Sequence, residues 1–409
     1  MRAVALSGAL IVGALGGGFG GIDGIGGGPE AVASAASAPS EERTPAGSAA
    51  AASPTGGIPT DLIGLVMASM TIEEKVGQLF MIDTDALEYG VRADDRQLGI
   101  SPAQIEHLQW YGPGGIIMFG GNVASAEQIA RYVADLQAAS PIPLLIAADE
   151  EGGTVSRLSG VGVDEFPDMA VIGGTGDPSA ARQVGETIGR QMAALGFNVD
   201  LAPVADVNTN PRNLVIGDRA FGSGPGLVAA MVAAEVEGLQ ESVSATLKHF
   251  PGHGDTDSDS HTGLATVAHD MERLRAVELV PFAAGIDAGA HLVLTAHVSA
   301  PAIDPSGAPA TMSRMLLTDV LRGELGFEGI IITDALDMAA ISEHYSVDEI
   351  ITGCIDAGAD ILLVPRDFHA AYDAFVALVK SGRISEERVD ESLRRILALK
   401  LAQIYADVE

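Results

Sequence analysis

The densest group of chemically active side chains lies between residues 248 and 261, where the sequence reads KHFPGHGDTDSDSH. These fourteen residues hold one lysine, three histidines and three aspartates. An aspartate close to a histidine, as with Asp259 and His261, can orient the imidazole ring and stabilise its protonated form. We therefore predict that Asp259 and His261 form a dyad in which the histidine donates a proton near neutral pH.

The same segment shares some features with metal sites. Asp255, Asp257 and Asp259 alternate as the ligands of a calcium loop do, and a mixture of histidine and aspartate also suits zinc. A calcium loop requires a glycine after the third acid and a glutamate further on, whereas Ser260 and His261 stand there. We predict that the protein uses neither a metal ion nor another cofactor.

A proton donor of this kind needs a second group that attacks the substrate. Asp334 ends the apolar run 329–334, so its carboxylate can face the same cavity as the dyad and attack an electrophilic carbon. A carboxylate nucleophile with a general acid is the arrangement of a retaining glycosidase, which forms a covalent glycosyl-enzyme intermediate. The predicted catalytic residues are Asp334, His261 and Asp259.

Further polar side chains suit the recognition of a sugar. A carboxylate can accept hydrogen bonds from two hydroxyls, and basic side chains supply the donors that a polyhydroxy substrate requires. The predicted substrate-binding residues are Asp149, Arg157, Arg219, Lys248 and His249. Two of them have structural alternatives. Arg219 can instead pair with Asp218, and Lys248 can instead neutralise Asp149 or Asp206.

These residues need a scaffold that gathers them in one place. From Thr71 onward, short runs rich in valine and isoleucine alternate with longer amphipathic segments, which indicates repeated strand–helix units and a parallel sheet. The eight predicted strands are 78–83, 115–119, 143–149, 199–206, 245–250, 291–298, 329–334 and 360–365. The predicted helices include 125–138, 180–195, 226–242, 271–288, 313–324 and 386–402.

Eight such units predict a single (β/α)8 TIM barrel with long loops, which we expect to occupy residues 58–409. A doubly wound open sheet is the alternative. It needs a glycine-rich phosphate loop after an early strand, and the glycines in 112–115 precede their strand. In a barrel, function gathers at the carboxyl ends of the strands. Charged and polar side chains at five predicted strand ends therefore favour an active site there.

The first 57 residues hold 14 of the 50 glycines and long Ala/Ser/Pro stretches without periodicity, so we expect a disordered segment before the barrel. The apolar run 3–15 and the small residues at 31–35 are typical of a secretory signal and its cleavage site. The run is too short to span a bilayer. We expect an extracellular or cell-envelope protein without a membrane-spanning helix. A cytoplasmic location is the alternative.

Composition narrows the class of partner. The chain has 55 acidic and 23 basic residues, a formal net charge of −32, which disfavours nucleic acid and anionic membranes as partners. The single cysteine, Cys354, excludes a disulfide framework within the chain and a cysteine-based zinc cluster. We expect a monomer that acts on a small glycan of little or no charge.

Four strings of the sequence resemble glycoside hydrolase family 3, and more closely its single-domain β-N-acetylhexosaminidases. They are DEEGGTVSRL (149–158), IGDRAFG (216–222), KHFPGHGDTDSDSH (248–261) and ITDALDM (332–338), and the resemblance extends from Thr71 to Ala402. It implies that Asp334 is the nucleophile, His261 the acid/base and Asp259 its partner. It also implies that the five substrate-binding residues hold a terminal N-acetylglucosamine of a muropeptide or chitin-type glycan.

Three alternatives to hydrolysis of N-acetylglucosaminides remain. The family's β-glucosidases carry a second domain that supplies the acid/base, whereas this sequence ends after its eighth helix, so we expect the proton donor from the barrel. A histidine acid also admits phosphorolysis, because phosphate can approach an imidazole more readily than a carboxylate. An inactive sugar-binding protein is disfavoured, because Asp334 and His261 are both present.

Overall fold

The computed structural model describes residues 60–88, 97–256 and 264–406. Its centre is a parallel sheet of eight strands in the order β11-β9-β7-β6-β3-β2-β1-β12. They are β1 (Phe80–Ile82), β2 (Gly115–Ile117), β3 (Leu145–Ala148), β6 (Val199–Asp200), β7 (Ser244–Phe250), β9 (Leu292–Thr295), β11 (Ile330–Ile332) and β12 (Leu362–Leu363). Each strand lies inside a predicted run, apart from β7, which begins one residue earlier, so the eight predicted strands are confirmed in place although most are shorter than predicted. The segment 1–57, with its predicted disorder and export signal, lies outside the described residues.

The sheet closes on itself. β1 pairs with β12, where Phe80 lies opposite Leu362. A parallel bridge joins Ile332, at the end of β11, to Ile361, and the amide of Thr333 donates to the carbonyl of Ile361 at 3.0 Å. The two outer strands of an open sheet would stay apart. The protein is therefore a (β/α)8 barrel, as predicted.

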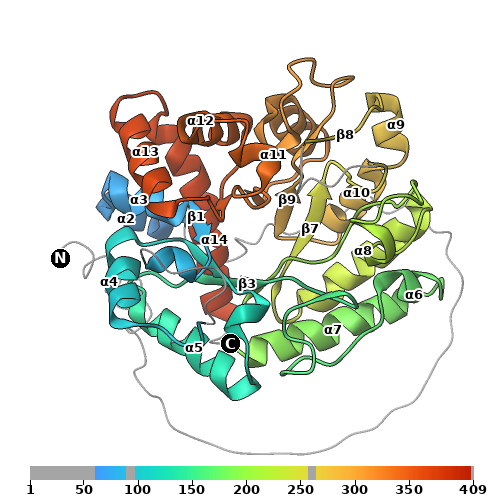
Figure 1. Ribbon diagram of the computed structural model, residues 1–409, viewed down its shortest axis with the longest axis horizontal. Helices are drawn as coiled ribbons and strands as arrows, with labels where there is room; N and C mark the ends of the chain where they lie inside the picture. Colours follow the sequence, from blue (N-terminus) through green and yellow to red (C-terminus); the bar gives the residue numbers. More distant parts are fainter. Residues whose placement is uncertain (1–59, 89–96, 257–263, 407–409) are drawn as a thin grey trace, which may run out of the picture.

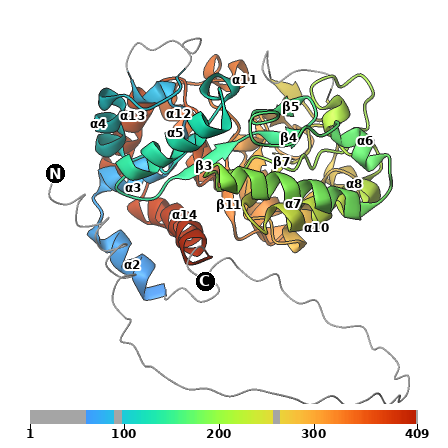
Figure 2. The ribbon, with the colours of Figure 1, turned by 90° about the horizontal axis from the view of Figure 1, so that it is seen from below.

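Helices surround the barrel (Figures 1 and 2). They are α2 (Thr60–Ser69), α3 (Ile72–Gln78), α4 (Pro102–Tyr111), α5 (Ala126–Ala139), α6 (Met169–Gly173), α7 (Pro178–Ala194), α8 (Pro225–Leu239), α9 (Met271–Ala276), α10 (Leu279–Asp287), η5 (Met315–Glu324), α11 (Ala339–Ser342), α12 (Val347–Ala357), α13 (Phe368–Lys380) and α14 (Glu386–Ala406). The last helix, α14, packs against the first two, α2 and α3, so the two ends of the barrel meet in Figure 1. Among the described helices, none combines the length and the hydrophobicity that a bilayer crossing requires.

Asp360 connects the place where the barrel closes, between β11 and β12, to the last helix, α14. It is fully buried just before β12. Its Oδ2 accepts hydrogen bonds from the amide of Ile331 at 2.9 Å and from Arg322 at 2.5 Å. Its Oδ1 accepts from Ser392 at 2.7 Å and Arg395 at 3.0 Å, both on α14. One carboxylate with four donors thus joins β11, the start of β12 and α14, and its buried charge is fully compensated.

Two predicted helices differ from the structure. The run 271–288 forms two helices, α9 and α10, that are separated at Val277, where φ is −132° and ψ is −69°. Pro281 explains the break, because it has no amide hydrogen and its ring would collide with the carbonyl of Val277 in a continuous helix. The run 313–324 is wound as a π-helix, η5.

Several helices were not predicted, although three of them carry a recognisable start signal. A serine or threonine caps the first turn, and a glutamate or glutamine three residues later reaches back to the amide of the capping residue. These pairs are Thr71 with Glu74 in α3, Ser101 with Gln104 in α4, and Ser346 with Glu349 in α12. The capping box therefore fixes where these helices begin.

Short strand pairs extend the rim of the barrel. They are the antiparallel hairpin of β4 (Glu150–Gly152) and β5 (Val155–Ser156), and the parallel pair of β8 (Ala265–Thr266) and β10 (Val298–Ser299). The hairpin turns at Gly153, whose φ of 61° strains any residue with a side chain. A Cβ there would lie 2.5 Å from the Cα of Asp168. The Glu150 carboxylate accepts from the amide of Arg157 at 2.9 Å, which holds the hairpin against the end of β3.

Candidate active site

A pocket of about 340 Å³ opens where the carboxyl ends of the strands converge. Its apolar wall comes from successive strand ends and includes Ile117, Leu201, Leu294 and Leu363. Every predicted site residue that the structure describes also lines it, and these are Asp149, Arg157, Arg219, Lys248, His249 and Asp334. The structure therefore brings six side chains from four separate stretches of sequence into one cavity.

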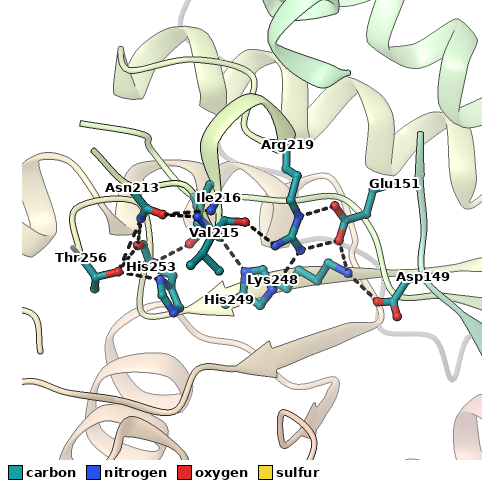
Figure 3. Close-up of polar contacts among 11 residues, drawn as sticks. Asp149, Glu151, Asn213, Val215, Ile216, Arg219, Lys248, His249, His253 and Thr256 are labelled. Atoms are coloured by element: carbon teal, nitrogen blue, oxygen red, sulfur yellow. Dashed lines mark hydrogen bonds and ion pairs between the residues drawn. The ribbon is translucent and has the colours of Figure 1, made fainter. Parts of the chain in front are cut away.

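Lys248 and Arg219 are joined by a carboxylate that was not predicted as a site residue, Glu151 (Figure 3). Lys248 lies on β7, and its Nζ is 2.5 Å from Glu151 and 2.8 Å from Asp149. Arg219 binds Glu151 through two parallel hydrogen bonds of 2.7 Å. Such bidentate pairs fix the plane of the guanidinium. Lys248 thus adopts the predicted structural alternative with Asp149, and Arg219 pairs with Glu151 rather than Asp218.

The charges of this network hold one another in their ionised forms. Burial alone would raise the pKa of Glu151, but Lys248 and Arg219 lower it to about 2. Burial would likewise lower the pKa of Lys248, and Asp149 and Glu151 raise it above its ordinary value instead. All three side chains therefore stay charged across the physiological range, with their donors and acceptors set in place before a ligand arrives.

A second chain of contacts positions His249. Its Nδ1 lies 2.7 Å from Oδ2 of Asp206, and its Nε2 lies 3.4 Å from Nη2 of Arg219. Oδ1 of Asp206 accepts the amide of His253 at 2.6 Å. Burial would raise the pKa of Asp206, and the two histidines lower it below its ordinary value. A buried aspartate therefore orients the ring of His249 at the edge of the pocket.

Asn213 links the loop that carries Arg219 to the end of β7 (Figure 3). Its amide nitrogen donates to the carbonyl of His253 at 2.8 Å, and its oxygen accepts the amides of Val215 at 3.0 Å and Ile216 at 2.9 Å. The carbonyl of Val215 in turn accepts from Arg219 at 2.9 Å. The buried Asn213 therefore sets the turn from which Arg219 reaches the pocket.

Asp334 and Arg157 enter the pocket from other sides. Asp334 follows β11, and its Oδ1 accepts the amide of Ala335 at 2.8 Å. The carbonyl of Ala335 lies 2.9 Å from Nε2 of His297, which fixes the backbone beside Asp334. Arg157 follows the hairpin of β4 and β5, and its Nη2 is 3.8 Å from Asp149. The side chain of Arg157 is 35% exposed, so its ion pair with Asp149 is weaker than the buried pair of Lys248 with Asp149.

The predicted dyad, Asp259 and His261, lies outside the described residues. The structure describes the chain on either side, up to Thr256 and again from residue 264. On these two flanks, Asp255 is hydrogen-bonded to His269 and accepts a hydrogen bond from Thr209 at 2.7 Å. The roles of Asp259 and His261 therefore stay predictions.

Sequence reasoning missed three residues of the pocket region: Glu151, His253 and Asp337. His253 and Asp337 line the cavity, and Glu151 lies behind Lys248 and Arg219. A signal existed for the first, because Glu151 belongs to the acidic cluster 149–151 that follows a predicted strand. No sequence rule distinguishes which of three consecutive acids turns toward the cations.

The pocket combines a carboxylate, Asp334, with fixed donors and acceptors on the opposite strands. Such a set can hold several hydroxyl groups in one orientation while a carboxylate faces the reacting carbon. Within the described ranges, no group of three or more histidine, cysteine, aspartate or glutamate side chains is arranged to hold a metal ion. That the reaction needs no cofactor remains a prediction.

A (β/α)8 barrel with ionised side chains at the carboxyl ends of its strands has the architecture of the barrel enzymes. The chain belongs to glycoside hydrolase family 3, since the model of the glycosyl hydrolase family 3 N terminal domain matches residues 71–399. The family resemblance predicted from the four strings is thereby confirmed.

Similar proteins of known name include Beta-hexosaminidase A of Pseudoalteromonas piscicida, which is 35% identical over 81% of this chain. The chain spans 61% of that relative's length. A family 3 beta-N-acetylglucosaminidase from Paenibacillus sp. FPU-7 is 43% identical with a TM-score of 0.75, over 82% of this chain and 63% of the other. A beta-N-acetylhexosaminidase from Beutenbergia cavernae is 32% identical with a TM-score of 0.72, over 81% and 98%.

Proposed function

We propose that the protein hydrolyses terminal, non-reducing β-linked N-acetylglucosamine from muropeptide or chitin-type glycans, with retention of configuration. The observation that carries this proposal is that Asp334 lines the same pocket as the five predicted sugar-binding side chains, in a family 3 barrel. The names of the Pseudoalteromonas, Paenibacillus and Beutenbergia relatives support the choice of sugar.

In the proposed first step, the carboxylate of Asp334 attacks the anomeric carbon, and the bond from that carbon to the glycosidic oxygen breaks. The leaving oxygen takes a proton from His261, whose protonated form Asp259 stabilises. In the second step, a water molecule attacks the same carbon and gives its proton to His261. The ester to Asp334 breaks, and the sugar leaves with its original β configuration.

The ion network supports the proposal that the sugar is held through its hydroxyls. Asp149 faces the pocket with Lys248 at 2.8 Å and Arg157 at 3.8 Å, so both sides of this carboxylate carry donors. His249 and Arg219 offer further ring and guanidinium hydrogens. A site that is paired with hydroxyls in this way rejects analogues that lack them, because its buried polar groups would be left without partners.

The test compares turnover of an aryl β-N-acetylglucosaminide with that of the matching β-glucoside, and follows the configuration of the first product by NMR. We expect a clear preference for the N-acetylglucosaminide and release of the β anomer. A preference for the glucoside contradicts the proposed sugar, and release of the α anomer contradicts the two-step mechanism.

Replacement of the nucleophile tests the assignment of Asp334. We expect Asp334→Asn to lower kcat by at least about a thousandfold, while the unfolding temperature stays close to that of the wild type. Asp218→Asn, at an exposed position of the loop that carries Arg219, is the matched control and should keep its activity. Substantial turnover in Asp334→Asn would show that another carboxylate is the nucleophile.

Phosphorolysis is tested with the same substrate. We expect that added inorganic phosphate leaves the rate unchanged and that the free sugar is the product. A rate that rises with phosphate, together with a sugar 1-phosphate product, would replace hydrolysis by phosphorolysis. Comparison of a chitin disaccharide with a muropeptide fragment then identifies the preferred glycan.

A further inference from the structure

One residue of the pocket has a strained backbone. Val364 follows β12 and has a φ of 41°, and within the described ranges it is the only residue other than glycine with a positive φ. A side chain that branches at Cβ is especially unfavourable in this left-handed region, which glycine adopts without steric cost. Pro365 adds to the constraint, because a residue before proline prefers an extended backbone. Glycine would therefore fit the backbone at this position better than valine.

Hydrogen bonds on both sides hold Val364 in this conformation. Its amide donates to the carbonyl of Met81 at 2.8 Å, and its carbonyl accepts the amide of Asp337 at 3.0 Å. The carbonyl of the preceding residue, Leu363, accepts the amide of Leu336 at 2.9 Å. These three bonds join the end of β12 to β1 and to the loop after β11. Strain of this kind persists where the surrounding structure fixes the backbone.

The register of the strands places Val364 close to the proposed nucleophile. A parallel bridge joins Ile332 to Ile361. Asp334 and Leu363, each two residues further along, therefore lie side by side at the carboxyl ends of neighbouring strands. Asp334 and Val364 both line the pocket. Because Val364 is only 7% exposed, the loss of its side chain would enlarge the pocket rather than the outer surface.

The section of the pocket that contains Val364 is apolar. The lining residues that β2 and β12 and their following loops contribute are Ile117, Phe119, Leu363 and Val364. The charged lining residues come from other strands of the barrel. A sugar ring has carbon–hydrogen groups as well as hydroxyls, and close packing against apolar side chains is the interaction available to them. This section therefore suits the part of the sugar that the ion network cannot bind.

We propose that Val364 is a specificity-determining residue: its side chain forms the apolar wall of the sugar subsite beside Asp334, and the strained backbone is retained because glycine would leave that wall open. The inference rests on the proposed function, because the sugar is the ligand of this wall. The strain lowers the stability of the fold, and the contact with carbon–hydrogen groups of the sugar is the corresponding gain in binding.

The unfolding temperatures of two variants test the strain. At an ordinary buried position, alanine is more stable than glycine, because glycine loses more conformational freedom on folding. At Val364 we expect the opposite order, with Val364→Gly unfolding about 1–2 °C above Val364→Ala. Val123 is the matched control, since it is 6% exposed and has an ordinary φ of −113°. There, Val123→Ala should unfold at the higher temperature. A higher temperature for Val364→Ala than for Val364→Gly would overturn the proposal.

Kinetics with an aryl β-N-acetylglucosaminide test the contact with the sugar. We expect both Val364→Gly and Val364→Ala to lower kcat/KM at least about tenfold, because the subsite loses part of its wall. Val123→Ala should stay close to the wild type. A purely structural role of Val364 would make the more stable of its two variants the more active one by the same measure, with little loss in either.

A third variant tests the direction of the side chain. Val364→Ile keeps the branched Cβ and adds one carbon, so we expect a higher KM and an unfolding temperature close to that of the wild type. An unchanged KM would place the side chain outside the subsite and overturn the proposal.

These measurements separate the failure of this inference from the failure of the proposed function. A wild type that turns over no N-acetylglucosaminide contradicts the proposed function. An active wild type whose kcat/KM is matched by both Val364→Gly and Val364→Ala contradicts only the role of Val364.

Discussion

Two cations, Lys248 and Arg219, share the carboxylate of Glu151, and the three side chains are almost removed from water. Charges in such surroundings are stable only as a group, because each would otherwise lose its hydration without compensation. The same group presents Asp149 to the pocket with one oxygen already bound by Lys248. The side chains proposed to recognise the sugar are therefore also part of the structural core at this end of the barrel.

Removal of one cation from this group should be costly to the fold. We expect Arg219→Met to lower the free energy of unfolding by about 3–5 kcal/mol, because Glu151 is left as a buried charge with one partner fewer. Arg275→Met is the matched control. It breaks the exposed pair with Glu324, so its stability should stay close to that of the wild type. Urea denaturation measures the free energy of unfolding of both variants. Equal losses of stability would contradict the view that Arg219 compensates a buried charge.

The depressed pKa of Glu151 predicts a dependence of stability on pH. Its pKa of about 2 in the folded state lies below the ordinary value of 4.5, so its ionisation stabilises the fold above pH 4.5. This contribution is lost as the pH falls from 4.5 toward 2. We expect Glu151→Gln to be less stable than the wild type at neutral pH and to approach it in that acid window. If the difference in stability between Glu151→Gln and the wild type stays constant with pH, the charge of Glu151 is not the cause of that difference.

At the scale of elements, the β4–β5 hairpin and the α7–α8 pair both depend on glycine. The hairpin places Glu151 and Arg157 around the end of β3 by means of a sharp turn at Gly153. The helix pair needs glycine only because two backbones touch where a side chain would stand, and not because of a positive φ. A Cβ on Gly238 would lie 2.2 Å from the carbonyl oxygen of Arg182.

This contact predicts a difference between two glycines of the same helix. We expect Gly238→Ala to destabilise the protein by about 1–3 kcal/mol or more, because α7 and α8 must move apart. Gly226→Ala, near the start of α8 with no atom within 4 Å of the added carbon, should be neutral or slightly stabilising. Thermal unfolding distinguishes them. Similar unfolding temperatures for both variants would show that α7 and α8 can move apart at little cost in free energy.

Comparison of the predicted and observed elements shows which features of the protein could be predicted from its sequence. All eight strands were predictable, since a buried parallel strand is a short run of β-branched residues that needs no knowledge of its neighbours. The gathering of Asp149, Lys248 and Asp334 also followed from the barrel rule. The hydrogen-bond and ion-pair partners of these residues could not be predicted in this way. Glu151 and Glu235 have the same side chain, and only three-dimensional packing decides that one meets two cations and the other meets none.

At the scale of the whole molecule, the charge of −32 is carried mainly by the surface. Within the described residues, seven acidic side chains are buried: Glu150, Glu151, Asp200, Asp206, Glu235, Glu278 and Asp360. The remaining described acids face solvent at least in part. The pocket itself has nearly balanced charges, so the proposed glycan of little charge could enter it despite the strongly acidic body.

Repulsion among these surface acids predicts a response to salt. We expect the unfolding temperature to rise by about 2 °C or more when sodium chloride increases from about 10 mM to about 200 mM, because screening weakens the repulsion. A neutral osmolarity control, sucrose at matched osmotic strength, separates screening from exclusion effects. A fall in unfolding temperature with salt would show that surface ion pairs outweigh the repulsion.

The pairing of the first strand of the barrel with the last has a consequence for biosynthesis. β1 pairs with β12, and Asp360 ties that pairing to Ser392 and Arg395 on the last helix. Contacts between such distant parts of a chain form late, because the intervening loop must first be ordered. During translation, the apolar strand β1 leaves the ribosome long before its second neighbour exists. The nascent chain must therefore carry one unpaired strand edge until nearly all of the barrel has been synthesised.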